Sequence, residues 1–331
     1  MIKAAVIGVG SIGQNHARVY RELQNVKLIA VSDNDEATAK RVGERLAVDY
    51  VSDYIQLLDE YKPDLVSVSV PTIHHYAVAM EAIKRGIHVL VEKPIAATLE
   101  QADELIAAAK ANNVKLTVGH IERFNPAIQE LKRRIDAGEI GDVFRIQSRR
   151  MGPFPTRIRD VGVVIDLASH DVDIVRYILD TEVTRVYAET TGSIATDRED
   201  TLDAVLRCEN NAIGTLNINW ITPTKIRELS VTGTSGMFIV NYLTQEVYFY
   251  ENADAAEMWQ SLSLLKGVSE GKMVRLKVQN QEPLKAELAS FVDAVRNDTD
   301  PLVSGEDGKK ALQLAQALVK SGLEQEIVKF N

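Results

Sequence analysis

The glycine-rich stretch GVGSIG, residues 8–13, constrains the fold of this chain more than any other feature. An apolar run at residues 4–7 precedes it, and Ile12, Val19 and Leu23 follow at helical spacing. A strand, a glycine turn and a helix in this order predict the first unit of a doubly wound α/β sheet. The pattern GxGxxG alone is a weak signal, and this context makes it specific.

Each glycine has its own predicted role in binding a dinucleotide. Gly8 permits the tight turn, Gly10 lets the backbone approach a pyrophosphate, and Gly13 lets the helix pack closely against the strand. The backbone around Ser11 and Ile12 lies at the positive end of the helix dipole, where free N–H groups attract phosphates. The sequence therefore predicts a pyrophosphate site at residues 10–12.

Asp33 ends the strand VKLIAVSD, twenty positions after Gly13. A carboxylate there accepts hydrogen bonds from both hydroxyls of an adenosine ribose and repels a 2′-phosphate, which favours NAD over NADP. Asn34 follows, and no arginine comes directly after it to hold such a phosphate. The alternative is that Asp33 only caps the helix that begins near Asp35.

The composition limits the class of protein. The length of 331 residues predicts two domains. A net charge of −9 argues against a general nucleic-acid or acidic-membrane binder, although it leaves room for a local basic pocket. Cys208 is the only cysteine and shares strand parity with Leu206, so we interpret it as a buried apolar residue without a disulfide. No apolar stretch is long enough to span a bilayer, and the first strand starts directly after Met1, so a cytoplasmic enzyme is expected.

The pattern of elements changes near residue 120. Before it, continuously apolar strands alternate with helices, which predicts a parallel sheet covered on both faces and a dinucleotide-binding domain at 1–120. After it, strands with alternating polarity predict a second α/β domain at 121–331 with a large, mostly antiparallel sheet that is open on one face. The two terminal helices carry an apolar stripe that needs a partner surface, and we expect the first domain to supply it. The expected strands are 3–7, 26–31, 64–70, 88–91, 115–118, 142–151, 183–191, 202–208, 212–220, 226–232, 237–241, 246–250 and 273–278, and the expected main helices are 11–23, 35–46, 72–85, 99–112, 125–137, 164–179, 284–296 and 306–328.

The tripeptide Glu92-Lys93-Pro94 ends the strand at 88–91, which is the fifth strand of the first domain when a short strand expected around Tyr50 is counted. Strand ends of a parallel sheet meet at the ligand edge, so the Lys93 ammonium is placed to hold a substrate hydroxyl and to stabilise developing negative charge on its oxygen. Partial burial would also allow this lysine to relay a proton. The alternative is a surface lysine paired with Glu92.

The stretch IDLASHDVDIVRYI places Asp166 and His170 four residues apart, on one face of a predicted helix. Histidine is the usual general base near neutral pH, and a neighbouring carboxylate fixes its tautomer or orients the substrate. Two alternatives remain open: a salt-bridge pattern on a solvated face, or a metal site that also uses His120.

The stretch GHIERFNP follows the sixth strand, at the same edge. His120, Glu122 and Arg123 are therefore candidates for hydrogen bonds to a polyol, and the alternative is that Arg123 forms structural ion pairs at a domain junction. His75 lies at a strand-to-helix turn beside the expected cofactor edge and is a candidate lining residue. We interpret the remaining three histidines as structural: His16, His74 and His88.

Four arginines fall within eleven positions of this acidic chain, an arrangement that favours a clamp for phosphate or carboxylate. The alternative is a solvated, charged loop between residues 152 and 162. The four residues are Arg149, Arg150, Arg157 and Arg159.

Five motifs together resemble the glucose–fructose oxidoreductase, inositol dehydrogenase and rhizopine-catabolism (Gfo/Idh/MocA) family: GVGSIGQNHA, the turn at residues 71–75, GIHVLVEKP, GHIERFNP and DLASHDVDIVRYI. The resemblance implies a Rossmann domain followed by an α/β domain whose open sheet forms a homodimer or homotetramer. It also implies that Lys93 belongs to the catalytic group, with His170 as general acid/base and Asp166 beside it. The expected cofactor-binding residues are Gly8, Gly10, Ser11, Ile12, Gly13, Asp33, Asn34, Pro71, Thr72, His75, Glu92 and Lys93.

Within this family, GHIERFNP followed by PFPTRIRDVGVVIDLASHD is most similar to the UDP-N-acetylglucosamine 3-dehydrogenases. This similarity implies oxidation of the sugar C3 hydroxyl to a ketone with NAD, and a diphosphate would need cationic partners such as the arginines. The expected substrate-binding residues are His120, Glu122, Arg123, Arg149, Arg157, Arg159, Asp166 and His170. The alternatives are a dehydrogenase for inositol or a free sugar, and a non-catalytic protein that senses a dinucleotide or a sugar.

Overall fold

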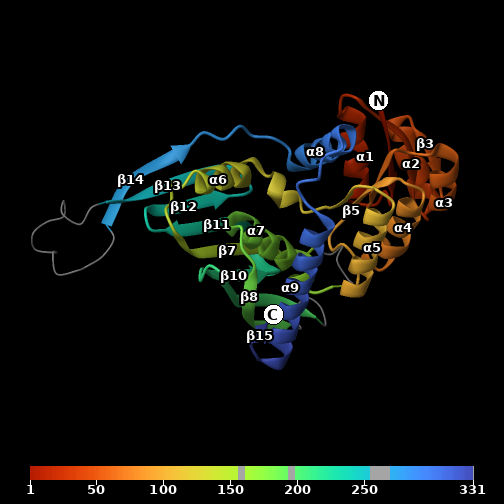
Figure 1. The fold of residues 1–331 in the computed structure, drawn as a ribbon. Coiled ribbons are helices and arrows are strands. Elements are labelled where there is room, and N and C mark those ends of the chain that lie inside the picture. Colours follow the sequence, from red (N-terminus) through yellow and green to blue (C-terminus); the bar gives the residue numbers. More distant parts are fainter. Residues whose placement is uncertain (156–160, 193–197, 254–268, 331) are drawn as a thin grey trace, which may run out of the picture. The chain divides into compact units, whose positions relative to one another are not determined.

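The computed structural model describes residues 1–155, 161–192, 198–253 and 269–330 (Figure 1). The chain forms two compact units, each built from two segments. Unit 1 comprises Met1–Phe124 and Glu282–Gln313, and unit 2 comprises Asn125–Gln281 and Leu314–Asn331.

Unit 1 contains a parallel sheet whose described strands lie in the order β3-β2-β1-β4-β5-β6. The order reverses beside β1, so a crevice for ligands is expected at the carboxyl ends of β1 and β4. The register aligns these ends, because Ile7 pairs with both Ser32 and Val68, and Val91 pairs with both Val68 and Val118. The strands are β1 (Ile2–Ile7), β2 (Val26–Ser32), β3 (Asp49–Val51), β4 (Leu65–Val68), β5 (His88–Val91) and β6 (Leu116–Val118).

Helices cover both faces of this sheet, and each face has its own apolar core. On one face, Val66 and Val89 pack with Ile83 of α4 and Leu105 of α5. On the other face, Val6 and Leu28 pack with Tyr20 of α1 and with Leu288 and Phe291 of α8. The helices of unit 1 are α1 (Gly13–Glu22), α2 (Glu36–Leu46), α3 (Tyr54–Gln56), a π-helical segment (Leu57–Tyr61), α4 (Thr72–Lys84), α5 (Leu99–Ala111), a 3₁₀ helix (Ile121–Phe124), α8 (Pro283–Asn297) and the first part of α9 (Gly305–Glu324).

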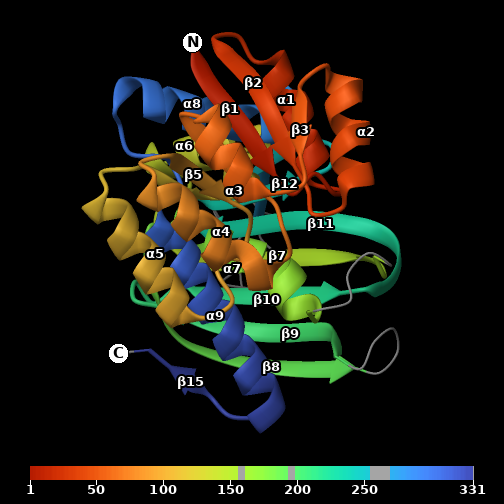
Figure 2. The same cartoon turned by 90° about the vertical axis from the view of Figure 1, so that its right-hand side faces the viewer.

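Unit 2 contains a second sheet, with the described strands in the order β14-β13-β12-β11-β7-β10-β9-β8-β15. Figure 2 shows β8, β9, β10 and β7 side by side. Strands β7 and β10 are parallel, and the other paired neighbours are antiparallel. The strands are β7 (Val143–Pro153), β8 (Val183–Gly192), β9 (Glu199–Cys208), β10 (Ile213–Asn219), β11 (Ile221–Gly233), β12 (Gly236–Asn241), β13 (Glu246–Ala253), β14 (Ser269–Leu276) and β15 (Val328–Lys329).

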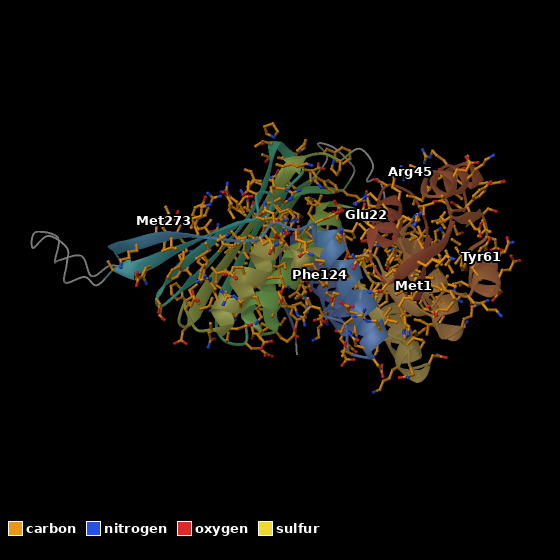
Figure 3. The ribbon with its side chains drawn as sticks, turned by 90° about the horizontal axis from the view of Figure 1, so that it is seen from above. Met1, Glu22, Arg45, Tyr61, Phe124 and Met273 are labelled. Carbon is orange, nitrogen blue, oxygen red and sulfur yellow. The ribbon has the colours of Figure 1, made fainter. Side chains whose placement is uncertain are left out.

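Alternating burial along the strands gives this sheet an inner and an outer face. On β10, Leu216 and Ile218 are buried, whereas Asn217 between them is partly exposed. On the same pattern Cys208 is buried on β9, which confirms its interpretation as an apolar residue, and burial raises the pKa of its thiol to about 11. The edge strand β14 carries Met273, whose side chain is 53% exposed (Figure 3). Helices α6 (Pro126–Asp136) and α7 (Ser169–Leu179) belong to the same unit.

The predicted fold class is confirmed: a Rossmann-type parallel sheet and a second, mostly antiparallel sheet. Several local details differ from the prediction. The expected helix at 306–328 ends at Glu324 as α9, and Val328 begins the short strand β15. Strand β7 continues through Pro153, into the expected loop, and the expected helix at 164–179 is divided into a π-helical segment, Val164–Ala168, and α7. Among the described residues, no helix is both long and apolar enough to cross a membrane.

Candidate active site

The glycine turn after β1 has the geometry that a dinucleotide phosphate requires. Gly8 has a φ of +84°, and a Cβ added there would lie 2.8 Å from the backbone of Ser69. A Cβ on Gly13 would lie 1.8 Å from the carbonyl oxygen of Gly8, whereas a Cβ on Gly10 would meet nothing within 4 Å. The fold therefore needs glycine at 8 and 13, and it leaves space at Gly10, where a pyrophosphate would approach the backbone.

Asp33 connects this turn to the end of β2. Its Oδ2 accepts a hydrogen bond from the Val9 backbone N–H at 2.8 Å, and its Oδ1 accepts one from the Asp35 N–H at 3.1 Å. The carboxylate thus braces the glycine turn and also contacts the start of α2. Carboxylate oxygens accept more than one hydrogen bond each, so this arrangement is compatible with a ribose diol as a further partner. Asn34 beside it is exposed.

The turn between β4 and α4 contributes the next group of expected cofactor residues. Pro71 is the N-cap residue of α4 and is exposed, and Thr72 is half-buried. His75 is 1% exposed, with Nδ1 2.7 Å from the Pro94 carbonyl oxygen and Nε2 2.8 Å from that of Val70. Burial lowers the pKa of this imidazole. Both ring nitrogens thus face backbone carbonyl oxygens, one after β5 and one after β4, and a neutral ring donates its one N–H to one of them.

Sequence reasoning missed one apolar residue in this turn. Ile73 is 70% exposed in the first turn of α4, and Ile12, at the glycine turn, is 38% exposed. Exposed isoleucines at the ligand edge of a doubly wound sheet are suited to contact a flat, apolar ring face. The signal in the sequence was an isoleucine directly after the helix start at Pro71-Thr72.

Lys93 follows β5, is half-buried and interacts electrostatically with Glu92. Its backbone N–H donates to Oε2 of Glu92 at 3.3 Å, and the Lys93–Pro94 peptide bond is cis. The other oxygen of Glu92, Oε1, accepts a hydrogen bond from His16 Nε2 at 2.9 Å. Burial opposes ionisation of Glu92, but the His16 hydrogen bond and the charge of Lys93 outweigh it and hold the pKa of Glu92 below its usual value.

In the segment after β6, the side chain of Arg123 has a different environment from those of His120 and Glu122. His120 is 1% exposed and lies directly beyond the strand end, and Glu122 is half-buried. Arg123 was expected to bind substrate, but its guanidinium is buried and forms an ion pair with Asp307 at 3.0 Å. It also donates to the Leu302 carbonyl oxygen at 3.4 Å. Arg123 thus follows the structural alternative, because these contacts fasten the start of α9 to the segment after β6.

In unit 2, Asp166 and His170 lie on either side of a change in helix type. Asp166 belongs to the π-helical segment and is 8% exposed, and His170 is half-buried in the first turn of α7. The sequence predicts a uniform α-helix here, because its apolar spacing carries no sign of the wider turn. Short π-helical segments inside helices are frequent at functional sites, since they redirect the side chains around them.

The predicted clamp of four arginines is not formed by its first two members. Arg149 and Arg150 are neighbours on β7, so their side chains leave the sheet on opposite faces. Arg150 is buried, forms an ion pair with Asp171 of α7 at 2.7 Å, and has its guanidinium 5.3 Å from the ring centre of Tyr242. Arg149 is 45% exposed and forms an ion pair with Glu228 at 2.9 Å. Arg157 and Arg159 lie outside the described residues.

Within residues 1–155, 161–192, 198–253 and 269–330, no three side chains of His, Cys, Asp or Glu are arranged as metal ligands.

Comparison with known proteins agrees with this geometry. A family model described as "Oxidoreductase family, NAD-binding Rossmann fold" matches residues 2–120, and the GFO/IDH/MocA C-terminal domain matches residues 128–239. The chain is 30% identical over 345 residues to myo-inositol 2-dehydrogenase of Thermotoga maritima, covering 100% of this chain and 99% of the relative. It is 28% identical over 314 residues to UDP-N-acetylglucosamine 3-dehydrogenase of Acidithiobacillus ferrooxidans, covering 95% of each.

Solved structures extend this similarity to the whole fold. A crystal form of the Acidithiobacillus ferrooxidans enzyme superposes with a TM-score of 0.86 at 27% identity and covers 97% of both chains. The scyllo-inositol dehydrogenase of Lactobacillus casei, solved with NAD(H) and scyllo-inositol, superposes with a TM-score of 0.83 at 23% identity and covers 99% of both chains. With both domain matches in the expected order and a 30% identical relative along its full length, the chain belongs to the Gfo/Idh/MocA family of NAD-binding oxidoreductases.

Proposed function

We propose that this protein is an NAD-dependent dehydrogenase that oxidises the C3 hydroxyl of UDP-N-acetylglucosamine to a 3-keto sugar. The observation that carries the dehydrogenase chemistry is the half-buried Lys93 at the end of β5, on the strand-end edge that also holds the glycine turn. The similarity to UDP-N-acetylglucosamine 3-dehydrogenase along 95% of both chains supports the choice of substrate.

The proposed mechanism assigns one task to each polar group. NAD, when bound, accepts the hydride from the carbon that carries the hydroxyl. His170 takes the hydroxyl proton as general base, and Asp166 orients its ring. Lys93 donates a hydrogen bond to the same oxygen and stabilises the negative charge that develops there. Gly10 and Asp33 fit the pyrophosphate and the ribose of the cofactor, respectively.

A neutral cyclic polyol such as myo-inositol is the second candidate substrate. The positions of Arg149 and Arg150 favour a neutral substrate. Arg150 forms a buried ion pair with Asp171, and Arg149 lies on the opposite face of β7 from Arg150. A diphosphate needs cationic partners, whereas an inositol ring does not. The 30% identity to myo-inositol 2-dehydrogenase over the full chain supports this candidate as well.

We also infer that the protein forms a homodimer or homotetramer through the outer face of the unit 2 sheet. On this face Val205 of β9 is a large apolar side chain that is 48% exposed. Strand faces of this kind are commonly covered by a second copy. Light scattering coupled to gel filtration measures the mass directly, and a monomer would contradict the inference.

The experiment measures NADH absorbance with purified protein, NAD, and either UDP-N-acetylglucosamine, N-acetylglucosamine or myo-inositol. An aminotransferase is added to a parallel set to remove a 3-keto product, because such a ketone accumulates poorly at equilibrium. Reduction of NAD only with the UDP-sugar supports the first candidate, and reduction with inositol supports the second. NADH binding without turnover of any alcohol would instead indicate a sensor protein.

Two variants test the assigned residues. Lys93→Ala and His170→Ala are each expected to lower kcat about 1,000-fold, because each removes a group that acts on the hydroxyl. The Kd for NADH, measured by its fluorescence, should stay within about threefold of the native value. Lys84→Ala, at an exposed lysine of α4, serves as the control. Near-native turnover in either active-site variant would refute the assignment.

A further inference from the structure

A chain of polar side chains runs through the interior of unit 1 and ends beside Lys93. The Tyr20 hydroxyl lies 2.9 Å from Ser67 Oγ, and Ser67 Oγ lies 3.1 Å from His16 Nδ1. His16 Nε2 then lies 2.9 Å from Oε1 of Glu92. Tyr20, Ser67 and His16 are fully buried, and they come from α1 and β4, whereas Glu92 directly follows β5.

The chemistry of these groups gives the chain one direction. A carboxylate only accepts hydrogen bonds, so Nε2 of His16 carries the proton that faces Glu92. In the neutral ring Nδ1 then accepts from the Ser67 hydroxyl, and Ser67 Oγ in turn accepts from Tyr20. Burial raises the pKa of Tyr20, so its phenol keeps the proton that starts the chain. Every member of the chain is satisfied in this single arrangement, which fixes the carboxylate at its end.

The Glu92 carboxylate is also held from its other sides. Its Oε2 accepts the backbone N–H of Lys93 at 3.3 Å, so the side chain folds back on the turn that presents the lysine. A Cβ added to Gly119, beyond β6, would lie 3.0 Å from Oε2 and 3.1 Å from Oε1. The carboxylate therefore rests against a glycine that has no side chain to displace it.

A second carboxyl group lies near this chain but stays outside it. Glu287 of α8 is 3% exposed, and neither of its oxygens has a hydrogen-bond partner among the described residues. Burial, together with the charge of Glu92, raises the pKa of Glu287 well above its usual value. Ionisation is therefore less favourable for Glu287 than for an ordinary glutamate, whereas the contacts of Glu92 favour its carboxylate form.

We propose that Glu92 and His16 are positioning residues for Lys93: the chain Tyr20–Ser67–His16 locks the carboxylate, and the carboxylate fixes the backbone from which the lysine side chain extends. The role rests on the proposed function, in which Lys93 acts on the substrate hydroxyl. Without the lock, the ammonium samples several orientations, and most of them are unproductive.

The first test is a matched pair at position 16. His16→Gln keeps a side-chain N–H for Glu92, whereas His16→Leu removes it and fills a similar volume with apolar atoms. We expect kcat to fall about 30-fold or more in His16→Leu but only a few-fold in His16→Gln, with the Kd for NADH within about twofold in both. A side chain that only fills space would give the opposite order, with Leu at least as active as Gln.

Because His16 is fully buried, its variants could fail to fold, so a milder variant at another position is also needed. Gly119→Ala adds one methyl group against the Glu92 carboxylate and leaves His16, Ser67 and Tyr20 in place. We expect a fall in kcat of about fivefold or more, with unchanged NADH binding. Native kcat in Gly119→Ala, together with equal activity of the two position-16 variants, would overturn the proposal.

The second test does not need a substrate. The protein is labelled briefly with acetic anhydride, and mass spectrometry gives the ratio of acetylation at Lys93 to that at the exposed Lys84. We expect Glu92→Gln to raise this ratio about threefold or more, because the Glu92 carboxylate holds the turn from which the Lys93 side chain extends and so confines that side chain. Glu44→Gln, at an exposed glutamate of α2, should leave the ratio unchanged.

The two tests separate the failure of the positioning role from that of the proposed function. If the native protein oxidises no alcohol, the proposed function fails, and the labelling ratio still decides whether Glu92 controls Lys93. If the native protein is active but Glu92→Gln changes neither kcat nor the labelling ratio, the positioning role fails alone.

Discussion

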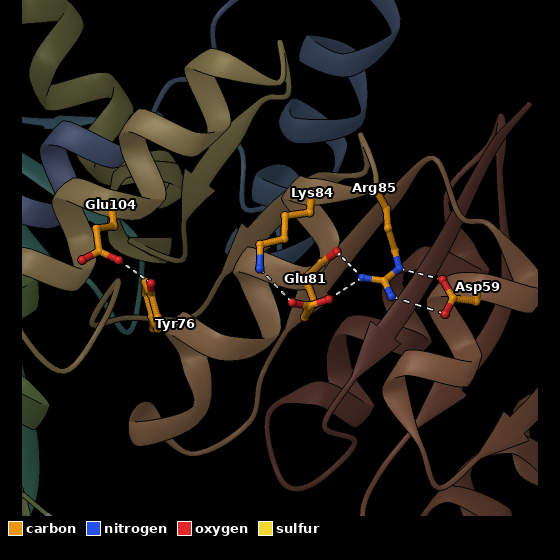
Figure 4. A network of polar contacts seen from close by, with 6 residues as sticks. All are labelled: Asp59, Tyr76, Glu81, Lys84, Arg85 and Glu104. Atoms are coloured by element: carbon orange, nitrogen blue, oxygen red, sulfur yellow. Dashed lines mark hydrogen bonds and ion pairs between the residues drawn. The ribbon is translucent and has the colours of Figure 1, made fainter.

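Two arginines of unit 1 both pair with carboxylates, yet they lie in opposite environments. Arg85, at the end of α4, contacts Asp59 at 2.7 Å and Glu81 at 2.6 Å (Figure 4). Its side chain is 26% exposed, and that of Asp59 is 55% exposed. Arg123 contacts Asp307 at 3.0 Å with a side chain only 5% exposed. The distances are alike, and burial is what differs.

The difference in burial between Arg85 and Arg123 decides how much each ion pair contributes to stability. Water solvates the Arg85 group in the folded and the unfolded protein, so the pairing contributes little to stability. Arg123 has given up most of its hydration, so the loss of Asp307 would remove a carboxylate that compensates a buried charge. A charge within a site motif, such as Arg123 in GHIERFNP, therefore becomes a structural residue when a buried partner is available.

The largest expected effect comes from breaking the buried pair. Asp307→Ala should lower the free energy of unfolding by about 3 kcal/mol or more, because Arg123 stays buried and loses a carboxylate. In the native protein, Oδ2 of Asp307 accepts hydrogen bonds from the Ser304 backbone N–H at 3.0 Å and from the Ser304 hydroxyl at 2.8 Å. The variant loses both of these hydrogen bonds. Urea unfolding followed by circular dichroism measures the change, and a loss below about 1 kcal/mol would contradict the role of burial.

The same pair predicts how stability changes in acid. Burial opposes ionisation of Asp307, but Arg123 and the Ser304 hydrogen bonds outweigh it and lower its pKa to about 2, from an ordinary value of 3.8. A lowered folded-state pKa means that this stabilisation is complete above pH 4 and is lost as the pH falls towards 2. Asp307→Asn keeps an acceptor for Ser304 but cannot ionise, so its stability should depend less on pH in this range. Identical acid slopes in the two proteins would refute the assignment.

The fold could be predicted from sequence because its signals are local. Continuous apolar runs mark the strands of the unit 1 sheet, and alternation marks those of unit 2, so strand type and helix period follow from neighbours in the chain. The glycine turn is also signalled locally, since Gly8 has a positive φ and Gly13 approaches the Gly8 carbonyl oxygen, although the contact of Gly8 with the backbone of Ser69 is distant in sequence. The π-helical segment at Val164–Ala168 was missed, because one wider turn leaves the apolar spacing almost unchanged.

The polar environment of the candidate site could be predicted only in part, because it depends on contacts far apart in sequence. His16 and Glu92 are separated by 76 positions, and no periodicity reports their pairing. Two other features did leave a signal. Arg149 and Arg150 are adjacent on a strand, so parity alone separates them, and Glu287 occupies an apolar stripe with Leu288 and Phe291, which predicts its burial.

Glu287 is the opposite of Arg123: it is a buried carboxyl group that has no hydrogen-bond partner among the described residues. Glu92, which directly follows β5, and Tyr20 of α1 are the titratable groups that interact electrostatically with Glu287. Because its pKa is raised above 4.5, the folded state binds more protons than the unfolded state above that pH, and native stability falls as pH rises. Glu287→Gln cannot ionise, so it should gain stability relative to the native protein between pH 5 and 8, by up to about 1.4 kcal/mol per pH unit.

Thermal unfolding across this pH range measures that difference. Glu306→Gln, at an exposed glutamate of α9, is the control and should follow the native curve. A stability difference between Glu287→Gln and the native protein that is constant from pH 5 to 8 would contradict the raised pKa of Glu287.

The smallest effect should come from the exposed network around Arg85. Arg85→Met keeps the aliphatic stem and removes the charge, so the free energy of unfolding should fall by about 1 kcal/mol or less. Mobile ions screen exposed charges, so this small loss should shrink further in 1 M NaCl, whereas the loss in Asp307→Ala should persist. Urea titrations of both variants at low and high salt make the comparison directly. A loss in Arg85→Met as large as that in Asp307→Ala, and equally insensitive to salt, would mean that the neighbours of Arg85, and not its exposure, set the strength of its ion pairs.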